Sequence, residues 1–117
     1  MNIEITYQMD SIWYICNMLL YNATLIIEEA SAGAWMQWMQ GEYLPELMET
    51  GLFISKRLLK VVDSPNEGLT YCVQFIAENQ EACDIYQNDY APAFIERMNI
   101  MFKDKYVSFN TIMEFID

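Results

Sequence analysis

The chain has 117 residues, the size of one domain, and 54% of them are hydrophobic, which is enough for one core. Lys and Arg number 6 against 17 Asp and Glu, and the resulting net charge of −11 argues against binding to nucleic acid or to an anionic membrane surface. The sequence has no histidine, which excludes Ser-His and Cys-His nucleophile pairs, His-ligated zinc and a histidine general base.

Residues 1–17 stand before the regular pattern, and we expect them to form an N-terminal extension to one domain of residues 18–117. Ile3, Ile5 and Tyr7 alternate as in a short extra strand. The apolar run of residues 12–27 is shorter than the ~20 residues of a membrane-spanning helix. No Lys or Arg precedes Lys56, which argues against a signal peptide. An odd number of cysteines without CxxC spacing favours reduced thiols and a cytoplasmic protein.

The first strand, the first helix and the second strand are predicted in that order after residue 18. Residues 19–28 are apolar on both alternations, which is typical of a strand covered on both faces. Ser31 is a candidate helix N-cap, and apolar residues then recur at helical spacing. Gly51 should end this helix because glycine readily adopts a positive φ. Residues 52–63 are then expected to form the second strand.

The second half of the chain predicts a hairpin, a helix and a last strand. Residues 64–68, Ser-Pro-Asn-Glu-Gly, are a strong turn signal and predict a hairpin with a third strand at residues 69–78. Residues 105–116 are expected to form the fourth strand. The helix between them has an apolar stripe of Cys83, Tyr86, Tyr90, Phe94, Met98 and Met101. The order β-α-β-β-α-β predicts an α+β fold of the ferredoxin-like type, an antiparallel four-stranded sheet with two helices on one face.

Each expected helix contains a proline. Pro45 cannot donate a hydrogen bond to the carbonyl of Gly41, and its ring crowds that carbonyl, so we expect a kink or break at residues 41–44. Pro92 has the same effect on the carbonyl of Asn88. We interpret both irregularities as curvature that fits the helices to the sheet, and room for a pocket is the alternative.

Alternation divides the predicted strands into two faces of different character. The face expected to lie under the helices is large and apolar: Tyr21, Ala23, Leu25, Ile27, Tyr71, Val73, Phe75, Phe109, Met113 and Phe115. The other face is neutral and half polar: Asn22, Thr24, Ile26, Thr70, Cys72, Gln74, Ile76, Ser108, Asn110 and Ile112. A solvent-facing sheet in so acidic a chain should carry more charge.

We therefore predict that the neutral face meets the same face of a second copy in a homodimer. The predicted dimer interface residues are Asn22, Thr24, Cys72, Gln74 and Asn110. The alternative is that residues 1–17 cover this face within one chain.

The helices are rich in aromatic residues, which form either a core or the wall of an apolar ligand pocket. Core packing is the favoured interpretation, and Trp38, Tyr43 and Tyr90 are the candidate ligand-binding aromatics. Arg57 alternates with apolar residues, an arrangement that would bring its guanidinium near the aromatic cluster, where it would bind a carboxylate of the protein or of a ligand. The favoured interpretation is an edge-strand arginine that extends into solvent, and Arg57 remains a candidate ligand-binding residue.

Glu42, Glu46 and Glu49 could share one helix face at spacings i, i+4 and i+7. Nothing near them supplies the remaining oxygen ligands of a divalent cation. We therefore predict a solvated acidic stripe, with no metal and no cofactor.

Several runs from residue 18 onward resemble a family of small bacterial proteins known as a domain of unknown function. They are LYNAT at 20–24, WMQWM at 35–39, PELM at 45–48, TGLF at 50–53, TYCVQF at 70–75, YAPA at 90–93 and FNTIMEF at 109–115. The family is similar in fold to the dimeric α/β-barrel group, which includes cofactor-independent monooxygenases of antibiotic biosynthesis and some haem-degrading enzymes. The resemblance implies a homodimer and brings no established activity with it.

Two functions remain open from the sequence. The first is a homodimeric module, structural or binding a small apolar or acidic ligand, without catalysis. The second is a cofactor-independent oxygenase or isomerase that acts on a small aromatic substrate between helices and sheet. In that enzyme Trp38 would shape the cavity, Tyr43 would donate a proton and Asn22 would donate a hydrogen bond. The first is favoured, because such chemistry usually needs a group that titrates near neutral pH.

Overall fold

The computed structural model describes residues 18–65 and 67–117, so the extra strand expected in residues 1–17 lies outside the described residues. The elements in chain order are β1 (Leu19–Ile27), α2 (Glu29–Trp38), η1 (Met39–Tyr43), α3 (Leu44–Glu49), β2 (Ser55–Lys60), β3 (Leu69–Ala77), α4 (Gln80–Ile85), η2 (Tyr86–Tyr90), α5 (Ala91–Phe102) and β4 (Tyr106–Glu114). The labels η1 and η2 denote π-helical turns, which interrupt the two helical runs α2–α3 and α4–α5.

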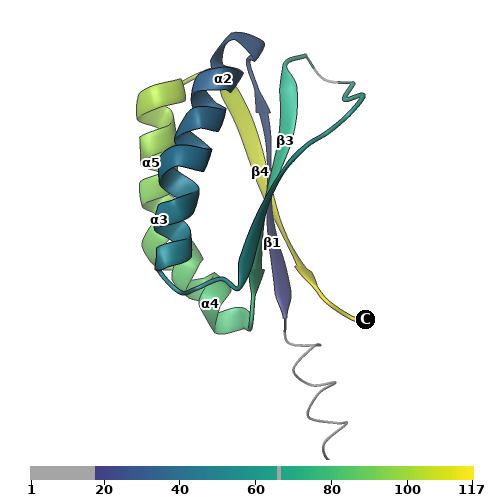
Figure 1. Ribbon diagram of the computed structural model, residues 1–117, viewed down its shortest axis with the longest axis vertical. Coiled ribbons are helices and arrows are strands. Elements are labelled where there is room, and N and C mark those ends of the chain that lie inside the picture. The colour runs from purple at the N-terminus through teal and green to yellow at the C-terminus, as the bar shows by residue number, and fades with distance from the viewer. Residues whose placement is uncertain (1–17, 66) are drawn as a thin grey trace, which may run out of the picture.

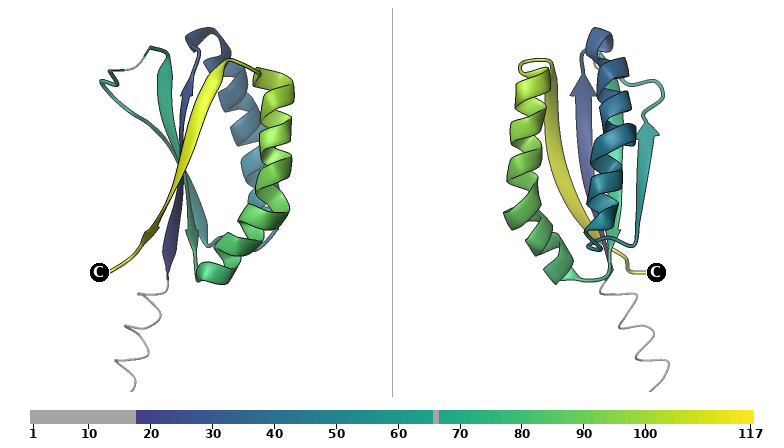
Figure 2. Two further views of the ribbon diagram at one scale, coloured as in Figure 1. Left: turned by 180° about the vertical axis from the view of Figure 1, so that it is seen from behind. Right: turned by 60° about the vertical axis from the view of Figure 1, so that its left-hand side comes forward.

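The four strands form one antiparallel sheet in the order β2-β3-β1-β4. Figure 1 shows all helical segments on the same face of this sheet, and the turned views of Figure 2 agree. The predicted α+β fold of the ferredoxin-like type is therefore confirmed. β1 and β3 are the two central strands, so their helix-facing side chains supply the sheet's part of the core.

The core fills the space between the sheet and the helices. Alternate residues of β1 and β3 pair directly on the helix-facing side, Tyr21 with Phe75 and Leu25 with Tyr71. All four are buried, and Trp35 of α2 packs on Tyr71 with ring centroids 5.0 Å apart. The faces predicted for β1 and β3 are therefore confirmed.

β2 is shorter than the expected strand of residues 52–63, because its 6 residues begin only at Ser55. The chain bends at Ile54, and Phe53 before the bend turns into the core, with its ring centroid 4.9 Å from that of Phe75. The predicted hairpin is confirmed by the register of β2 with β3, in which Arg57 pairs with Gln74. Arg57 therefore shares a face with Gln74 and points away from the helices.

Both helical runs contain a π-turn directly before a proline. The backbone N–H of the preceding residue, Leu44 or Ala91, donates to the carbonyl five residues earlier instead of four. The wider turn keeps the ring of Pro45 or Pro92 from the carbonyl that it would strike in an α-helix. The irregularity expected at residues 41–44 is thus a π-turn.

The two π-turns arise from matching stretches of sequence. Residues 39–45 read MQGEYLP and residues 86–92 read YQNDYAP, so both contain glutamine, an acidic residue, tyrosine and proline at equivalent positions. One stretch lies in the β1–β2 connection and the other in the β3–β4 connection. Each half of the fold therefore contains a π-turn followed by a proline.

A π-turn also changes which residues of the following helix are buried, because its extra residue rotates everything after it. Tyr90, the last residue of η2, and Met101 of α5 are each 39% exposed, whereas Met98 and Phe102 of α5 are buried. The expected stripe placed Tyr90 and Met101 on the buried side and is wrong at these two positions.

β4 has its faces in the opposite phase to the prediction. The register pairs Ala23 with Asn110 and Thr24 with Phe109, so Asn110 lies on the helix-facing side and Phe109 on the other. The placement of Ser108, Asn110 and Ile112 on the open side, with Phe109 and Met113 under the helices, was wrong. β4 is an edge strand whose residues after Tyr106 are all exposed. Burial therefore does not confine its apolar residues to one face.

The sheet face away from the helices is called the open face below. Its strand residues are Leu20, Asn22, Thr24 and Ile26 of β1, Ser55, Arg57 and Leu59 of β2, Thr70, Cys72, Gln74 and Ile76 of β3, and Val107, Phe109, Thr111 and Met113 of β4. In Figures 1 and 2 no labelled helix lies over it.

The backbone conformation at three glycines can be tested by substitution with alanine. Gly68 has φ +84° and an added Cβ would lie 2.5 Å from the carbonyl oxygen of Ile27, so Gly68→Ala should destabilise the fold by about 3 kcal/mol or more. Gly51 has φ +75° in open space, so Gly51→Ala should cost only about 1–2 kcal/mol. Gly33→Ala, in the exposed surface of α2, should stabilise by about 0.5–1 kcal/mol.

Urea unfolding of the three variants measures this order directly. Equal effects of Gly68→Ala and Gly51→Ala would show that the close approach of the hairpin to β1 is not present in solution.

Candidate functional site

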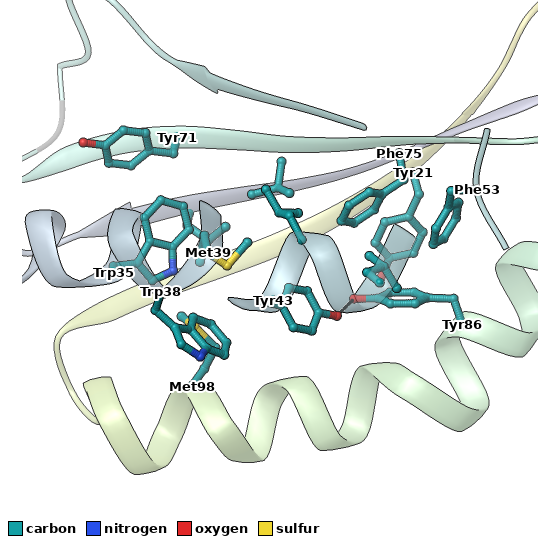
Figure 3. Packing of buried hydrophobic residues seen from close by; sticks show 14 of the residues in the cluster. Tyr21, Trp35, Trp38, Met39, Tyr43, Phe53, Tyr71, Phe75, Tyr86 and Met98 are labelled. Atoms are coloured by element: carbon teal, nitrogen blue, oxygen red, sulfur yellow. Dashed lines mark hydrogen bonds between the residues drawn. The ribbon is translucent and has the colours of Figure 1, made fainter. Parts of the chain in front are cut away.

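Aromatic side chains from the two helical runs meet above the sheet, as Figure 3 shows for Trp38, Tyr43 and Tyr86. The rings of Trp38 and Tyr43 stack with centroids 5.4 Å apart. Phe94 of α5 packs against both, 4.3 Å from Tyr43 and 5.8 Å from Trp38. These distances are typical of favourable ring contacts, so the helices are joined by an aromatic cluster.

Tyr43 ends η1 and Tyr86 begins η2, and their hydroxyl oxygens are 2.7 Å apart in a buried hydrogen bond (Figure 3). Burial raises the pKa of Tyr43 to about 12, although the hydrogen bond between Tyr43 and Tyr86 offsets part of the rise. Burial raises the pKa of Tyr86 as well. Both phenols are therefore protonated at neutral pH, and neither can serve as a general base there.

Arg97 of α5 lies beside this cluster on the outer side. Its guanidinium carbon is 5.1 Å from the ring centroid of Trp38 and 5.8 Å from that of Tyr43, within the range of cation–π contacts. Its Nη1 donates to Oε2 of Glu46 at 2.7 Å, and Nη2 donates to Oε1 at 3.5 Å. The hydrogen bond from Arg97 to Glu46 raises the pKa of the guanidinium. Arg97 thus connects α5 to α3 through its ion pair, and to α2 and η1 through the aromatic faces of Trp38 and Tyr43.

A cleft of about 130 Å³ opens between α3 and the η2–α5 run. It is lined by Tyr43, Glu46, Leu47, Thr50, Tyr90, Ala93, Phe94 and Arg97. Apolar and aromatic atoms form most of its wall, and Glu46 and Arg97 are the charged residues that line it. Such a combination is typical of small-molecule sites.

The structure brings together only part of the predicted ligand-binding set. Tyr43 and Tyr90 line the cleft, and Trp38 stacks behind Tyr43. Arg57 does not belong to this site, because it is exposed on the open face beside Gln74, on the other side of the sheet. The structure agrees with the favoured interpretation of Arg57, an exposed arginine on the edge strand β2. A position near the aromatic cluster is wrong, since the bend at Ile54 ends the alternation on which it depended.

Arg97 is the functional residue that the sequence reasoning missed. It follows Phe94 by three positions on the same helix, so the two side chains are neighbours on one helix face. This spacing indicates that Arg97 contacts the aromatic cluster, because an arginine next to an aromatic stripe is positioned to stack on the rings.

On the open face, four of the five predicted interface residues form one polar network. Nδ2 of Asn22 donates to Oγ1 of Thr24 at 3.0 Å, and Nε2 of Gln74 donates to Oδ1 of Asn22 at 3.2 Å. Oγ1 of Thr24 also lies 3.8 Å from Sγ of Cys72. Asn110 is not part of the network, because it lies on the helix-facing side of β4.

The residues of the catalytic alternative do not share a site. Trp38 and Tyr43 lie among the helices, whereas Asn22 lies on the open face of the sheet. Asn22 therefore cannot donate a hydrogen bond to a substrate that contacts Tyr43, and the geometry gives no support to the oxygenase or isomerase hypothesis.

The acidic residues do not form a metal site in the described part of the chain. Within residues 18–65 and 67–117, no group of three or more Cys, Asp or Glu side chains is placed to hold a metal ion. Glu46, the middle residue of the acidic stripe, pairs with Arg97 instead.

Among the described residues, no helix has the length and apolar character to cross a membrane.

Comparison with known proteins agrees with this fold. Residues 18–116 match the model of a family described as "Domain of unknown function (DUF4286)", which confirms the resemblance seen in the sequence. No curated protein matches the chain.

Solved structures with the same fold come from several bacteria and a marine source. A Caulobacter crescentus protein provisionally named an antibiotic biosynthesis monooxygenase is 17% identical, with a TM-score of 0.61 over 90% of this chain and 95% of its own. A dimeric ferredoxin-like protein from an uncultured marine organism is 8% identical, with a TM-score of 0.62 over 86% and 96%. An ethyl tert-butyl ether D family protein from Bacillus halodurans is 11% identical, with a TM-score of 0.60 over 82% and 97%. At such identities these likenesses show the fold alone.

The buried pair of hydroxyls predicts a coupling energy between Tyr43 and Tyr86. Tyr43→Phe or Tyr86→Phe leaves the remaining hydroxyl unpaired and should cost about 1–3 kcal/mol of unfolding free energy. The double variant removes both hydroxyls and should cost about 1 kcal/mol less than the sum of the single changes. Urea unfolding of the four proteins measures the cycle. Additive single effects would mean that the two hydroxyls do not interact in solution.

The raised pKa of Tyr43 predicts a loss of stability at high pH. Below the ordinary tyrosine pKa of 10.0 both states are protonated, and the contribution of the buried phenol is complete. Between pH 10.0 and about 12 the unfolded chain releases this proton while folded Tyr43 keeps it, so the unfolding free energy should fall by about 3 kcal/mol. Urea unfolding at several pH values measures the fall, and the Tyr43→Phe/Tyr86→Phe double variant should show a shallower one. An equal slope in both proteins would contradict the assignment.

Proposed function

The chain belongs to the DUF4286 family of domains of unknown function, and on this premise we propose that it is a homodimeric binding module rather than an enzyme. Two copies would pack their open faces together, and each copy would hold a small ligand in the cleft between its helices. The observation that carries the proposal is the apolar strip on the open face of β4.

This strip consists of Val107, Phe109 and Met113, which are 61%, 57% and 41% exposed. Val107 and Phe109 are neighbours on one side of β4, and only Thr111 separates them from Met113 on that side, so the three residues form one largely apolar strip. Removal of such a surface from water stabilises an association by roughly 25 cal/mol for each Å² of apolar area. Contiguous apolar patches of this kind mark interaction sites more often than free surface.

The distribution of charged residues also supports the open face as the dimer interface. Among the strand residues of the open face that the structure describes, none is acidic, and Arg57 at the edge strand β2 is the one charged residue. The whole chain has 17 Asp and Glu, and those among residues 18–65 and 67–117 all lie outside this face. Two copies with a net charge of −11 each repel at long range, and a neutral face is the surface on which they can approach.

Asn22, at the centre of the open face, can be buried with little loss of hydrogen bonding. Asn22 is only 8% exposed, and its amide oxygen and nitrogen are both hydrogen-bonded within the network of Thr24 and Gln74. Polar groups that already have partners lose little when water is removed. The network therefore supports a face made for contact with a second sheet.

One structural neighbour, the marine protein, is described as a dimeric ferredoxin-like protein. This supports the homodimer by analogy of fold only. The described cysteines also support a reducing compartment, since Cys72 and Cys83 are both free thiols. We accordingly place the dimer in the cytoplasm.

The proposed interface is tested by two neighbouring residues that lie on opposite faces of β4. Phe109→Asp places an unpaired carboxylate in the interface and should raise the dimer dissociation constant by about 100-fold or more. Asn110→Asp adds the same charge on the helix-facing side and should leave the dimer unchanged. Sedimentation velocity over a range of concentrations distinguishes the species.

Two outcomes would overturn the proposal. One is a Phe109→Asp variant that remains as dimeric as the unmodified chain. The other is an unmodified chain that stays monomeric at every concentration, in which case residues 1–17 become the expected cover of the open face.

A further inference from the structure

The volume of the cleft between α3 and α5 limits what it can hold. At about 130 Å³ it is smaller than the roughly 300–1,000 Å³ of sites for drug-sized ligands. An apolar cavity of about 150 Å³ is known to hold one benzene molecule. The cleft therefore suits a single six-membered ring better than a fused ring system.

The wall of the cleft favours a flat, apolar body. Tyr43, Tyr90 and Phe94 contribute aromatic rings, and Leu47 contributes an aliphatic side chain. Tyr43 and Leu47 are almost fully buried, so this part of the wall is fixed by the core. A ring placed between such side chains gains offset or edge contacts beyond simple burial.

Arg97 supplies the polar contact at one end of the cleft. A guanidinium has five N–H donors in a fixed plane, and Arg97 gives Glu46 one short hydrogen bond at 2.7 Å and one long one at 3.5 Å. Its remaining donors can bind an acceptor oxygen of a ligand. The carboxylate of Glu46, by contrast, already has both oxygens directed at Arg97.

The charges around the cleft exclude ionic ligands. Glu46 balances Arg97 by direct contact, and Glu42 lies close enough to act on the same guanidinium, so an anion meets a local excess of negative charge. A cation would have to compete with Arg97 for Glu46 and for the ring faces of Trp38 and Tyr43, over which Arg97 already lies. A neutral ligand meets neither obstacle.

We propose that this cleft binds a neutral, single-ring compound with one acceptor oxygen, of the class of simple phenols, its ring between Tyr90 and Phe94 and its oxygen on Arg97. The inference deepens the ligand-binding part of the proposed function and rests on it, and it does not depend on the dimer. It also places the ligand between the two helices and not between helices and sheet, where aromatic side chains fill the core.

Phenol at pH 7 is the probe, with benzoate and benzylamine as rings of the same size that carry a negative or a positive charge. In amide-detected NMR titrations of the full chain, phenol should cause saturable shifts at Thr50, Ala93, Phe94 and Arg97, with a dissociation constant on the order of 1 mM. Benzoate and benzylamine should bind at least tenfold more weakly.

Two phenylalanine substitutions on α5 form a matched pair. Ala93→Phe fills the cleft and should weaken phenol binding at least tenfold. Ile95→Phe adds a ring at a site that is 50% exposed and does not line the cleft, so it should leave binding unchanged. Arg97→Lys keeps the charge but loses the planar fork, and should weaken phenol binding without preventing folding.

The proposal is overturned if phenol causes no saturable shift at the cleft residues, or if the shifts appear on the open face of β4 instead. It is also overturned if Ala93→Phe binds phenol as well as the unmodified chain, or if either charged ring binds as tightly as phenol. The diffusion coefficient measured on the same samples reports the dimer separately. A monomer that still binds phenol would contradict the proposed assembly and leave this inference standing.

Discussion

The hydrogen bond between the buried hydroxyls of Tyr43 and Tyr86 determines how the two helical runs meet. Each tyrosine belongs to a π-turn, and each π-turn lies directly before a proline that an unbroken α-helix would not tolerate. A buried phenol needs a partner, so the two turns are held opposite each other. Phe94 and Arg97 both lie on α5, so the tilted contact of Phe94 with Tyr43 and the contact of Arg97 with the same ring follow from this arrangement.

The sheet separates two surfaces with different physical tasks. Its helix-facing side is filled by aromatic and aliphatic residues and contributes the core, whereas its open face combines a satisfied polar network with an apolar strip on β4. The acidic residues of a chain with net charge −11 avoid the strands of the open face in the described part of the molecule. The ligand site proposed among the helices and the assembly surface proposed on the sheet therefore share no residue, which makes the two proposals separable by experiment.

The element order, the hairpin and the faces of β1 and β3 could be read from the sequence, because central strands bury one alternation of large apolar residues such as Tyr21 and Phe75. The phase of β4 could not, because an edge strand with Phe109 on one side and Ile112 on the other has no single buried alternation. Tyr90 was misplaced because a π-turn shifts the helical stripe by one residue, and single-sequence periodicity contains no such shift.

The candidate site was predicted in part for related reasons. Trp38 and Tyr43 were found because aromatic residues at helical spacing mark the contact between helices. The alternation that would bring Arg57 to them is interrupted by the bend at Ile54, and Arg57 has the exposed edge-strand position that the sequence favoured. Arg97 was missed although its spacing from Phe94 places it at the cluster. Among the predicted interface residues, Asn22, Thr24, Cys72 and Gln74 do lie together, and Asn110 follows β4 to the opposite side.

The most direct test of the sheet-to-sheet assembly is an isotope-filtered NOE experiment on a mixture of labelled and unlabelled copies of the chain. Only contacts between different copies give signals in this experiment. The structure predicts signals from the ring of Phe109 and the methyl groups of Val107 and Met113. Signals confined to exposed residues of α5 such as Ile95 and Ile100, or no signals at all at millimolar concentration, would contradict it.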